Sequence, residues 1–362
     1  MPDPARKRPL IVPLFIPNQG CPCRCVYCRQ EDITGRQDYL LAASEVEEIL
    51  SRAVQSPRFD ASASPEIAFY GGTFTALPEQ TLRDLLGAAY RFVQNGKFGS
   101  IRVSTRPDAL KPGILSLMRS FGVTLVELGV QSMDEEVLCK TRRGYTPGHV
   151  VEAVEQLRRH GFRVGAQLMP GLPGDSEERF LETVRRVATL RPALVRLYPT
   201  VVIQGTVLAA WYREGRFRPL SLDRAVALCA RSCTYLEARG IPVIRMGLQG
   251  SPTLEQPGEI LAGPWHPAFG FLVRTRIYQE RLERLLAGME GAKTVQIRVH
   301  PRDVPLVRGH RNRALRELER RIRPGTLMIL PDDALTPGRP VLEARNDEEP
   351  AAGAECAEKA AQ

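Results

Sequence analysis

The sequence predicts an α/β protein built on a partial (β/α)6 barrel of the TIM type, followed by a small C-terminal basic α/β appendage. Short strand-like runs alternate with amphipathic helical runs six times, which is typical of a parallel sheet covered by helices. Six repeats are fewer than the eight of a closed barrel, so we expect a partial one. Beyond the sixth repeat the pattern loosens and leads into a strongly basic segment.

The strands are expected at residues 9–16, 66–70, 101–105, 124–130, 162–169 and 193–199. The first helix is expected at 44–54, because Ser44 and Glu47 have the spacing of a capping box. Pro78 predicts the start of the second helix, and Thr146 and Gly161 bound the fourth. The remaining helices are expected near 112–120, 176–190 and 221–238, a further strand near 241–246 and a long helix near 268–288.

Charge and pattern divide the chain into four parts. We expect a barrel at 1–250, a helical connector at 251–292, a basic strand–helix–strand unit at 293–330 and a disordered acidic tail at 331–362. Residues 293–325 contain ten lysines and arginines against three acids. Residues 331–362 reverse this balance, with three basic residues against eight acidic ones.

Composition excludes some classes of protein. The 362 residues are 43% hydrophobic, enough for a sizeable core, and no apolar run reaches the eighteen residues of a membrane span. The N-terminal apolar run contains prolines and no small-residue cleavage site, so it predicts a buried strand and not a signal peptide. We therefore expect a cytoplasmic protein without a membrane partner. Its thiols are then reduced, which favours a metal or redox site over disulfides.

Four of the eight cysteines lie in the stretch CPCRCVYC, residues 21–28, directly after the first predicted strand. Closely spaced, non-adjacent thiolates suit an iron–sulfur cluster, in which each ligand binds a different iron. With three ligands, one iron stays open to a substrate or cofactor. A structural zinc and a simple electron carrier remain alternatives, although the other cysteines form no second two-spacer pair.

The spacing Cys21-x-x-x-Cys25-x-x-Cys28, with Tyr27 before the last cysteine, resembles the radical S-adenosylmethionine (SAM) superfamily. This resemblance implies a [4Fe-4S] cluster on these three cysteines and SAM on the fourth iron. It also implies an external electron donor similar to flavodoxin or ferredoxin. Cys23 falls within the spacer and is expected to be a bystander.

The resemblance also implies SAM contacts on loops that follow other strands. The motif YGGTF would contact the methionyl amino group, LGVQS the ribose, and RRGYT the methionyl carboxylate. The family has a glutamate where this chain has Ser104, so that contact would be neutral here, and Gln167 is a further polar partner. The predicted cofactor-binding residues are Gly71, Gly72, Thr73, Ser104, Gln131, Arg143 and Gln167.

Over residues 10–250 the ordered motifs resemble the catalytic subunit of Elongator, which modifies the wobble uridine of tRNA. The resemblance covers only the radical SAM half, and the family's acetyltransferase domain has no counterpart in this sequence. A radical SAM tRNA-modifying enzyme is therefore the leading hypothesis. The alternatives are a radical SAM oxidase or dehydrogenase of a small molecule, such as a porphyrin precursor, and a zinc-stabilised RNA-binding protein without catalysis.

The basic unit supplies candidate RNA contacts, which are Arg308, Arg311, Arg313, Arg316 and Arg320. Arginines clustered on one helix can follow a phosphate backbone. The alternative is a solvated helix face partly paired with Glu317 and Glu319. VRGHRN, residues 307–312, lacks the second glycine of a G-x-x-G RNA-binding loop.

Overall fold

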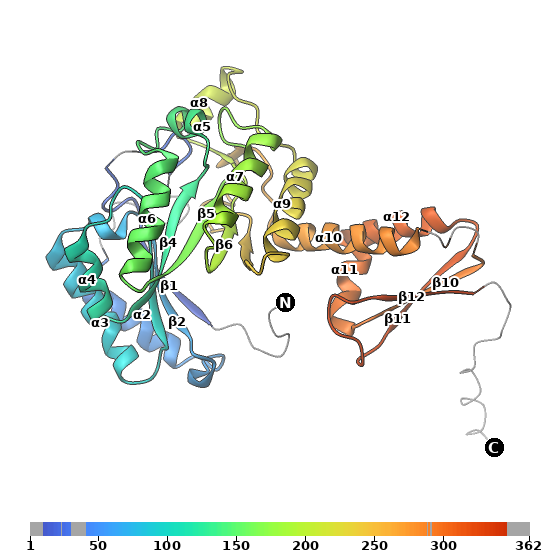
Figure 1. The fold of residues 1–362 in the computed structure, drawn as a ribbon, viewed down its shortest axis with the longest axis horizontal. Coiled ribbons are helices and arrows are strands. Elements are labelled where there is room, and N and C mark those ends of the chain that lie inside the picture. The colour runs from blue at the N-terminus through green and yellow to red at the C-terminus, as the bar shows by residue number, and fades with distance from the viewer. Residues whose placement is uncertain (1–9, 23, 30–40, 288, 290–291, 346–362) are drawn as a thin grey trace. The chain divides into compact units, whose positions relative to one another are not determined.

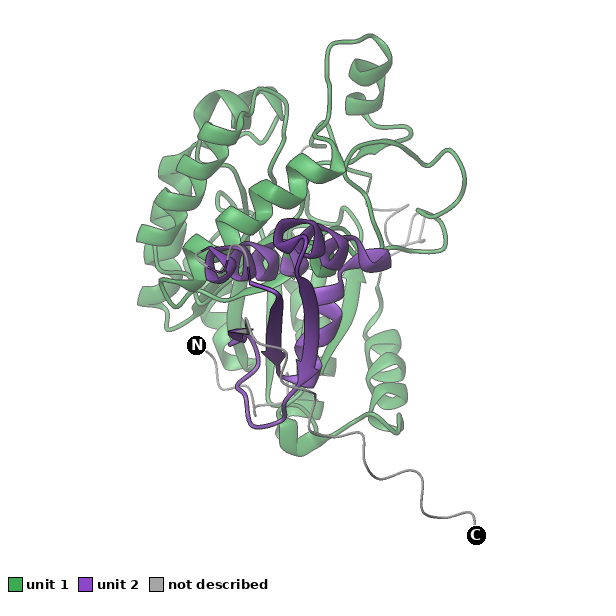
Figure 2. Ribbon diagram, turned by 90° about the vertical axis from the view of Figure 1, so that its right-hand side faces the viewer, with its two compact units in different colours: residues 1–273 green, residues 274–362 purple. Residues whose placement is uncertain are grey.

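The computed structural model describes residues 10–22, 24–29, 41–287, 289 and 292–345. The chain forms two compact units, Met1–Val273 and Arg274–Gln362 (Figure 2). The boundary falls inside helix α10, which runs through the predicted connector from Phe269 to Leu286.

Unit 1 is organised around one seven-stranded sheet in the order β1-β2-β3-β4-β5-β6-β8, with every neighbouring pair parallel. The strands are β1 (Ile11–Ile16), β2 (Glu66–Gly71), β3 (Ser100–Thr105), β4 (Val123–Gln131), β5 (Arg163–Leu168), β6 (Leu194–Leu197) and β8 (Val243–Met246). The helices between them are α2 (Ala43–Val54), α3 (Glu79–Gln94), α4 (Pro112–Ser120), α5 (Glu135–Lys140), α6 (Pro147–Arg159), α7 (Glu177–Thr189), α8 (Val207–Arg213) and α9 (Leu222–Glu237). A short antiparallel pair, β7 (Val202–Ile203) and β9 (Ile260–Ala262), completes the unit.

The sheet curls so that helices cover its outer face (Figure 1). The predicted partial barrel is confirmed, and the segment expected near 241–246 is its seventh strand. Side chains along β2 and β3 are buried over almost their full length, because both sheet faces are covered. Helices such as α3 and α7 pack one apolar stripe against the sheet, which explains why the 3.6-residue periodicity located them.

One local prediction is wrong. Helix α2 begins at Ala43, so Ser44 lies inside its first turn and does not cap it. The Glu45 carboxylate accepts a hydrogen bond from the backbone N–H of Ala42 at 3.1 Å. The acidic half of a capping box is therefore present two residues earlier than expected, at Glu45 instead of Glu47.

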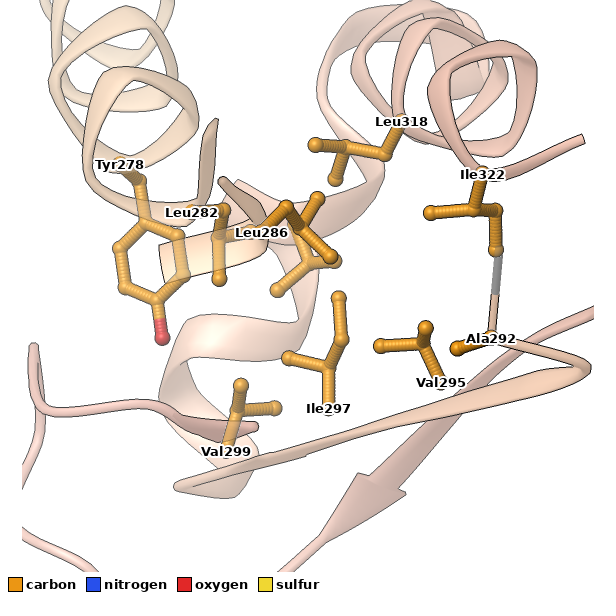
Figure 3. Packing of buried hydrophobic residues seen from close by; sticks show 10 residues of the cluster. Tyr278, Leu282, Leu286, Ala292, Val295, Ile297, Val299, Leu318 and Ile322 are labelled. Carbon is orange, nitrogen blue, oxygen red and sulfur yellow. The ribbon is translucent and has the colours of Figure 1, made fainter. Parts of the chain in front are cut away.

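Unit 2 packs helices on one face of a three-stranded sheet in the order β11-β10-β12. Strand β10 (Thr294–Val299) lies parallel to β11 (Thr326–Pro331) and antiparallel to β12 (Val341–Arg345). The crossover between the parallel strands contains α11 (Val304–Arg308) and α12 (Arg313–Ile322). Alternate residues of β10, namely Val295, Ile297 and Val299, are fully buried against these helices and α10 (Figure 3).

The predicted strand–helix–strand unit is therefore present, but the predicted boundary of the disordered tail is wrong. Residues 341–345 form β12 and pair with β10, because Leu342 adds its side chain to the same apolar core. The rest of the predicted tail, 346–362, lies outside the described residues.

Candidate active site

The loop after β1 carries the three spaced cysteines and is held from two directions. The backbone N–H of Val26 donates to the carbonyl oxygen of Thr141 at 3.3 Å, and Leu208 in α8 donates to the carbonyl of Val26 at 2.8 Å. Cys25 is buried, whereas Cys21 and Cys28 are partly exposed. Cys23 lies outside the described residues.

Gly72 lets the loop after β2 approach the cysteine loop closely. Its N–H donates to the carbonyl of Ile16 at 2.9 Å, and the neighbouring Thr73 N–H donates to the carbonyl of Gln19 at 2.7 Å. A Cβ on Gly72 would stand 2.0 Å from the Gln19 carbonyl oxygen. Glycine is required here because two backbones meet, so a close contact within the chain explains this glycine without a ligand.

The predicted site residues converge on one cavity at the carboxyl ends of the strands. It encloses about 1040 Å³ of empty space, counting the solvent at its mouth. Its lining includes all ten predicted metal-binding and cofactor-binding residues: Cys21, Cys25, Cys28, Gly71, Gly72, Thr73, Ser104, Gln131, Arg143 and Gln167. This edge of a parallel sheet is where such folds bind ligands.

Arg143 contacts a predicted cluster ligand directly. Its Nη1 donates to Cys25 Sγ at 3.0 Å and to the Tyr27 hydroxyl at 3.3 Å. Nη2 donates to the Gly129 carbonyl at 2.9 Å, and Nε donates to the Tyr145 hydroxyl at 2.8 Å. These contacts use four of the five N–H donors of the guanidinium. Bidentate pairing with a carboxylate needs two donors, so Arg143 would have to release one of these partners.

Two further side chains contact the other cysteines. Thr73 Oγ1 lies 3.3 Å from Cys21 Sγ, and the Cys28 thiol donates to Asn18 Oδ1 at 3.9 Å. Burial raises the pKa of the Cys21 thiol above its usual value, and the hydrogen bond with Thr73 offsets this only in part. Burial also raises the pKa of the Tyr27 phenol well above its usual value, so this group stays protonated.

Gln131 adopts an uncommon backbone conformation at the cavity wall. Its φ is +62°, in the left-handed region, and the register of β4 against β5 shifts beside it. Such a residue is held by its surroundings at some energetic cost, commonly at functional sites. The Met169 N–H donates to the Gln131 carbonyl at 3.0 Å, and Gln167 Nε2 donates to Gln131 Oε1 at 3.3 Å. The two predicted glutamines therefore form one amide pair that faces the cavity.

A buried layer of charge lies inside the half-barrel and was missed by the sequence reasoning. Glu127 in β4 accepts hydrogen bonds from Arg102 Nη1 and from Arg196 Nη2, both at 3.1 Å, and forms ion pairs with both arginines. The Tyr70 hydroxyl also donates to Glu127 at 3.1 Å, and all three charged side chains are less than 10% exposed. Arg196 Nη1 donates at 3.1 Å to the hydroxyl of Tyr198, which lines the cavity. The charged layer therefore supports a residue of the cavity wall.

Other cavity-lining residues were also missed as site candidates. They are Asn18, Arg24, Tyr27, Thr105, Arg106, Gly129, Met169, Tyr198, Pro199, Val201, Ile203 and Leu248. Arg106, Met169 and Tyr198 immediately follow a strand, and for these three this position was the available signal. Arg106 is held by a two-point contact with Asp108, at 2.9 and 2.8 Å, within the stretch STRPD, residues 104–108.

The arrangement of thiols can be compared with the group that it is expected to hold. Among the described residues, no three His, Cys, Asp or Glu side chains are grouped closely enough to hold a single metal ion. Three thiols do face one cavity, each beside a different polar partner. That donor set suits a polynuclear cluster, whose ligands bind separate irons.

Two family models match the chain. A model of the radical SAM superfamily matches residues 15–187, and a model of the radical SAM C-terminal domain matches residues 192–279. The first match contains every cysteine and cofactor-binding residue predicted above. The chain belongs to the radical SAM superfamily. The expectation of a radical SAM enzyme is thereby confirmed at the level of the superfamily.

Relatives of this radical SAM chain include a tRNA uridine(34) acetyltransferase and Elongator proteins. The chain is 41% identical over 120 residues to the tRNA uridine(34) acetyltransferase of Dehalococcoides mccartyi, a match of 32% of this chain and 26% of that protein. It is 37% identical over 187 residues to Elongator complex protein 3 of Danio rerio, covering 46% and 34% of the two chains. The expected similarity to the Elongator subunit is confirmed, although the matches span only about a quarter to a third of these relatives.

A solved structure shows the same fold. The archaeal Elp3 of Methanocaldococcus infernus, with an N-terminal deletion, superimposes with a TM-score of 0.58 at 22% identity. The superposition covers 76% of this radical SAM chain and 64% of that one. In the part of the chain that the structure describes, no helix is long and apolar enough to cross a membrane.

Proposed function

We propose that this chain binds a [4Fe-4S] cluster through Cys21, Cys25 and Cys28 and uses SAM to modify a uridine of tRNA. The observation that carries the proposal is the convergence of all ten predicted residues on one cavity at the carboxyl edge of the sheet. Membership of the superfamily supports the two cofactors. Similarity to a tRNA uridine(34) acetyltransferase and to Elongator complex protein 3 supports tRNA as the substrate.

The cavity residues have separate roles in this proposal. When bound, the cluster and SAM supply a 5′-deoxyadenosyl radical that abstracts hydrogen. Arg143 holds a positive charge and a hydrogen-bond donor against the Cys25 sulfur and so fixes this ligand in place. Gln131 and Gln167, which also line the cavity, present their amide groups to a polar cofactor.

The buried layer below the cavity supports precise placement. Glu127 joins β4 to β3 and β6 through two arginines, so strands on both sides of the cavity are fixed to one carboxylate. Side chains held by such contacts can position a substrate without costly rearrangement. Tyr198 is the point at which this layer reaches the cavity.

Anaerobic reconstitution with iron and sulfide tests the cofactor part. We expect a brown protein whose electron paramagnetic resonance spectrum, after reduction, shifts when SAM is added. Cys21→Ser, Cys25→Ser and Cys28→Ser should each abolish the cluster. Cys139→Ser is the matched control, because this exposed thiol lies on α5 and does not line the cavity. A colourless protein that retains zinc would refute the proposal and favour the non-catalytic alternative.

The substrate part needs a separate experiment. The reconstituted protein, SAM, a reductant and unmodified tRNA are incubated, and the nucleosides are then compared by mass spectrometry. We expect a new uridine derivative together with 5′-deoxyadenosine, and neither product from the Cys25→Ser variant. Suppose that 5′-deoxyadenosine forms without any change in tRNA, even with acetyl-CoA added. This result would support the assignment of the cofactors and refute tRNA as the substrate.

A further inference from the structure

Unit 2 carries a basic face that the active site does not use. Helix α12 buries Ala314, Leu318 and Ile322 along one side. Arg313, Arg316 and Arg320 follow at i, i+3 and i+7, which places them together on the opposite side. All three are exposed, as are Arg308 and Arg311 just before the helix. We call these five exposed arginines together the α12 basic face.

Most of this charge is not neutralised within the chain. Arg313 pairs with Glu317 at 3.3 Å, and Gln279 also donates to Glu317 at 3.1 Å. Within the described residues, no ion pair is formed by the other four arginines, which are Arg308, Arg311, Arg316 and Arg320. Four exposed guanidinium groups thus remain available to a polyanion.

The loop that leads into α12, Gly309–Asn312, has positive φ at Gly309, Arg311 and Asn312. Gly309 has a φ of +67°, and a Cβ there would stand 2.6 Å from Ala314 Cβ, so glycine is required. Asn312 has a φ of +59° and a ψ of 21°, in the left-handed region that usually requires glycine. Asparagine is one of the few other residues that accept this conformation. Asn312 therefore stands at the position of the second glycine of a G-x-x-G loop in a backbone conformation that glycine favours.

The position of this loop between two helices also fits phosphate binding. It joins two helices, α11 and α12, that connect the parallel strands β10 and β11. KH domains clamp four backbone nucleotides of single-stranded RNA in a G-x-x-G loop. The two central residues here, His310 and Arg311, are both exposed.

We propose that the α12 basic face and the loop Gly309–Asn312 bind the phosphate backbone of a single-stranded RNA segment. This inference rests on the proposed function, because a tRNA substrate offers unpaired segments to such a surface. The arginines contribute charge, and the loop contributes a backbone shape that phosphates can approach closely. The inference concerns binding only and assigns no catalytic step to unit 2.

Fluorescence anisotropy of the full chain with a fluorescein-labelled 12-nucleotide RNA tests this surface. The variant combines Arg308→Gln, Arg311→Gln and Arg316→Gln. The matched control removes the same charge from helices of unit 1, as Arg52→Gln, Arg159→Gln and Arg185→Gln, all exposed positions. We expect the first variant to raise Kd about tenfold or more at low salt and to reduce the salt slope by roughly 2 to 3. The control should change Kd less than about twofold, because its positions lie outside the proposed surface.

A second pair of variants tests the loop shape. Asn312→Gly keeps access to the left-handed region and should retain RNA affinity, whereas Asn312→Val disfavours it and should weaken binding. Circular dichroism then checks that unit 2 stays folded. Any of three results would overturn the inference. The arginine variant and Asn312→Val could bind the RNA as tightly as the wild type, or the wild type could prefer an RNA duplex of the same sequence. The third result is that polyglutamate displaces the labelled RNA as effectively as unlabelled RNA does.

The failure of this inference can be separated from failure of the proposed function. Cluster absorption and SAM cleavage without RNA should be unchanged in the arginine variant. If that variant modifies tRNA with an unchanged KM, the RNA surface is wrong and the proposed function stands. If RNA binding depends on the surface but no tRNA nucleoside changes, the substrate assignment fails and the surface stands.

Discussion

Arg143 donates a hydrogen bond to the Sγ atom of Cys25 at 3.0 Å, across 118 residues of sequence. The same guanidinium also holds the Tyr27 hydroxyl and the Gly129 carbonyl. One side chain thus links the cysteine loop after β1 to the end of β4. The resemblance implied that Arg143 pairs with the methionyl carboxylate, so two roles for it can now be compared.

Replacing Arg143 with methionine should lower the reduction potential of the bound cluster. A positive charge and a hydrogen bond at a cluster thiolate favour the reduced form, and methionine removes both. We expect a shift of roughly tens of millivolts to more negative potential, measured by redox titration with electron paramagnetic resonance. Arg159→Met, at an exposed helix position, is the control.

The opposite result would identify the other role. If Arg143→Met leaves the potential unchanged but weakens SAM binding, the guanidinium pairs with the carboxylate and releases Cys25. Arg143→Lys sharpens this comparison, because lysine keeps the charge and loses the two-point geometry.

Replacing Glu127 with leucine should strongly destabilise unit 1. Arg102 and Arg196 would then be buried without their shared carboxylate, while both remain charged. Breaking a buried ion pair on one side costs about 3–5 kcal/mol of unfolding free energy. The control is Glu182→Gln, which breaks an exposed pair with Arg185 and should change the free energy by less than about 1 kcal/mol.

Urea denaturation followed by circular dichroism measures both variants. A loss near that of the control would mean that water or neighbouring groups compensate the arginines. A combined replacement of Glu127, Arg102, Arg196 and Glu66 by apolar residues should recover part of the loss. Glu66 is included because it also pairs with Arg102 and would otherwise be left buried without that partner.

The parts of the fold that follow from local patterns were predictable. The strands at whose carboxyl ends the cysteines, the two glycines and Gln131 lie were located from alternating runs, and parallel topology then placed these ends together. The buried layer was not predictable in the same way. Nothing local marks Glu127 as the partner of Arg102 and Arg196, because these contacts span 25 and 69 residues of sequence.

Backbone conformation explains two further differences. A sequence does not display φ, so Asn312 read as a missing glycine although it adopts the glycine-like conformation. Strand β12 follows a stretch rich in acidic residues and proline, and charge alone suggested disorder. Its pairing with β10 depends on the packing of Leu342 against a core whose residues come from separate parts of the sequence.

The carboxyl group of Asp175 should make stability depend on pH between about 4 and 6. Burial raises its pKa from the usual 3.8 to about 6, although backbone N–H groups of Gly171 and Ser176 partly offset this. The folded state therefore binds more protons than the unfolded state in this window. The contribution of the Asp175 carboxyl group to the free energy of unfolding is fully present below pH 3.8 and is lost as the pH rises through 6.

Asp175→Asn should remove this dependence, because an amide does not titrate. Relative to the wild type, the variant should gain up to about 3 kcal/mol between pH 4 and pH 7. Unfolding free energies at several pH values measure the difference, with the exposed Asp84→Asn as the control. A constant difference between Asp175→Asn and the wild type across this range would show that Asp175 titrates near its usual value.

Gly72→Ala should disrupt the site although it adds only one methyl group. The new Cβ would stand 2.0 Å from the Gln19 carbonyl oxygen, a backbone atom, so one of the two loops must move. We expect loss of about 1–3 kcal/mol of stability and a large fall in iron bound after reconstitution. Gly113→Ala, on α4, is the control, since no heavy atom lies within 4 Å of its added Cβ. That variant should bind iron normally and be slightly more stable, because alanine favours helix. Normal iron content in Gly72→Ala would mean that the cysteine loop can move away from β2 without losing its cluster.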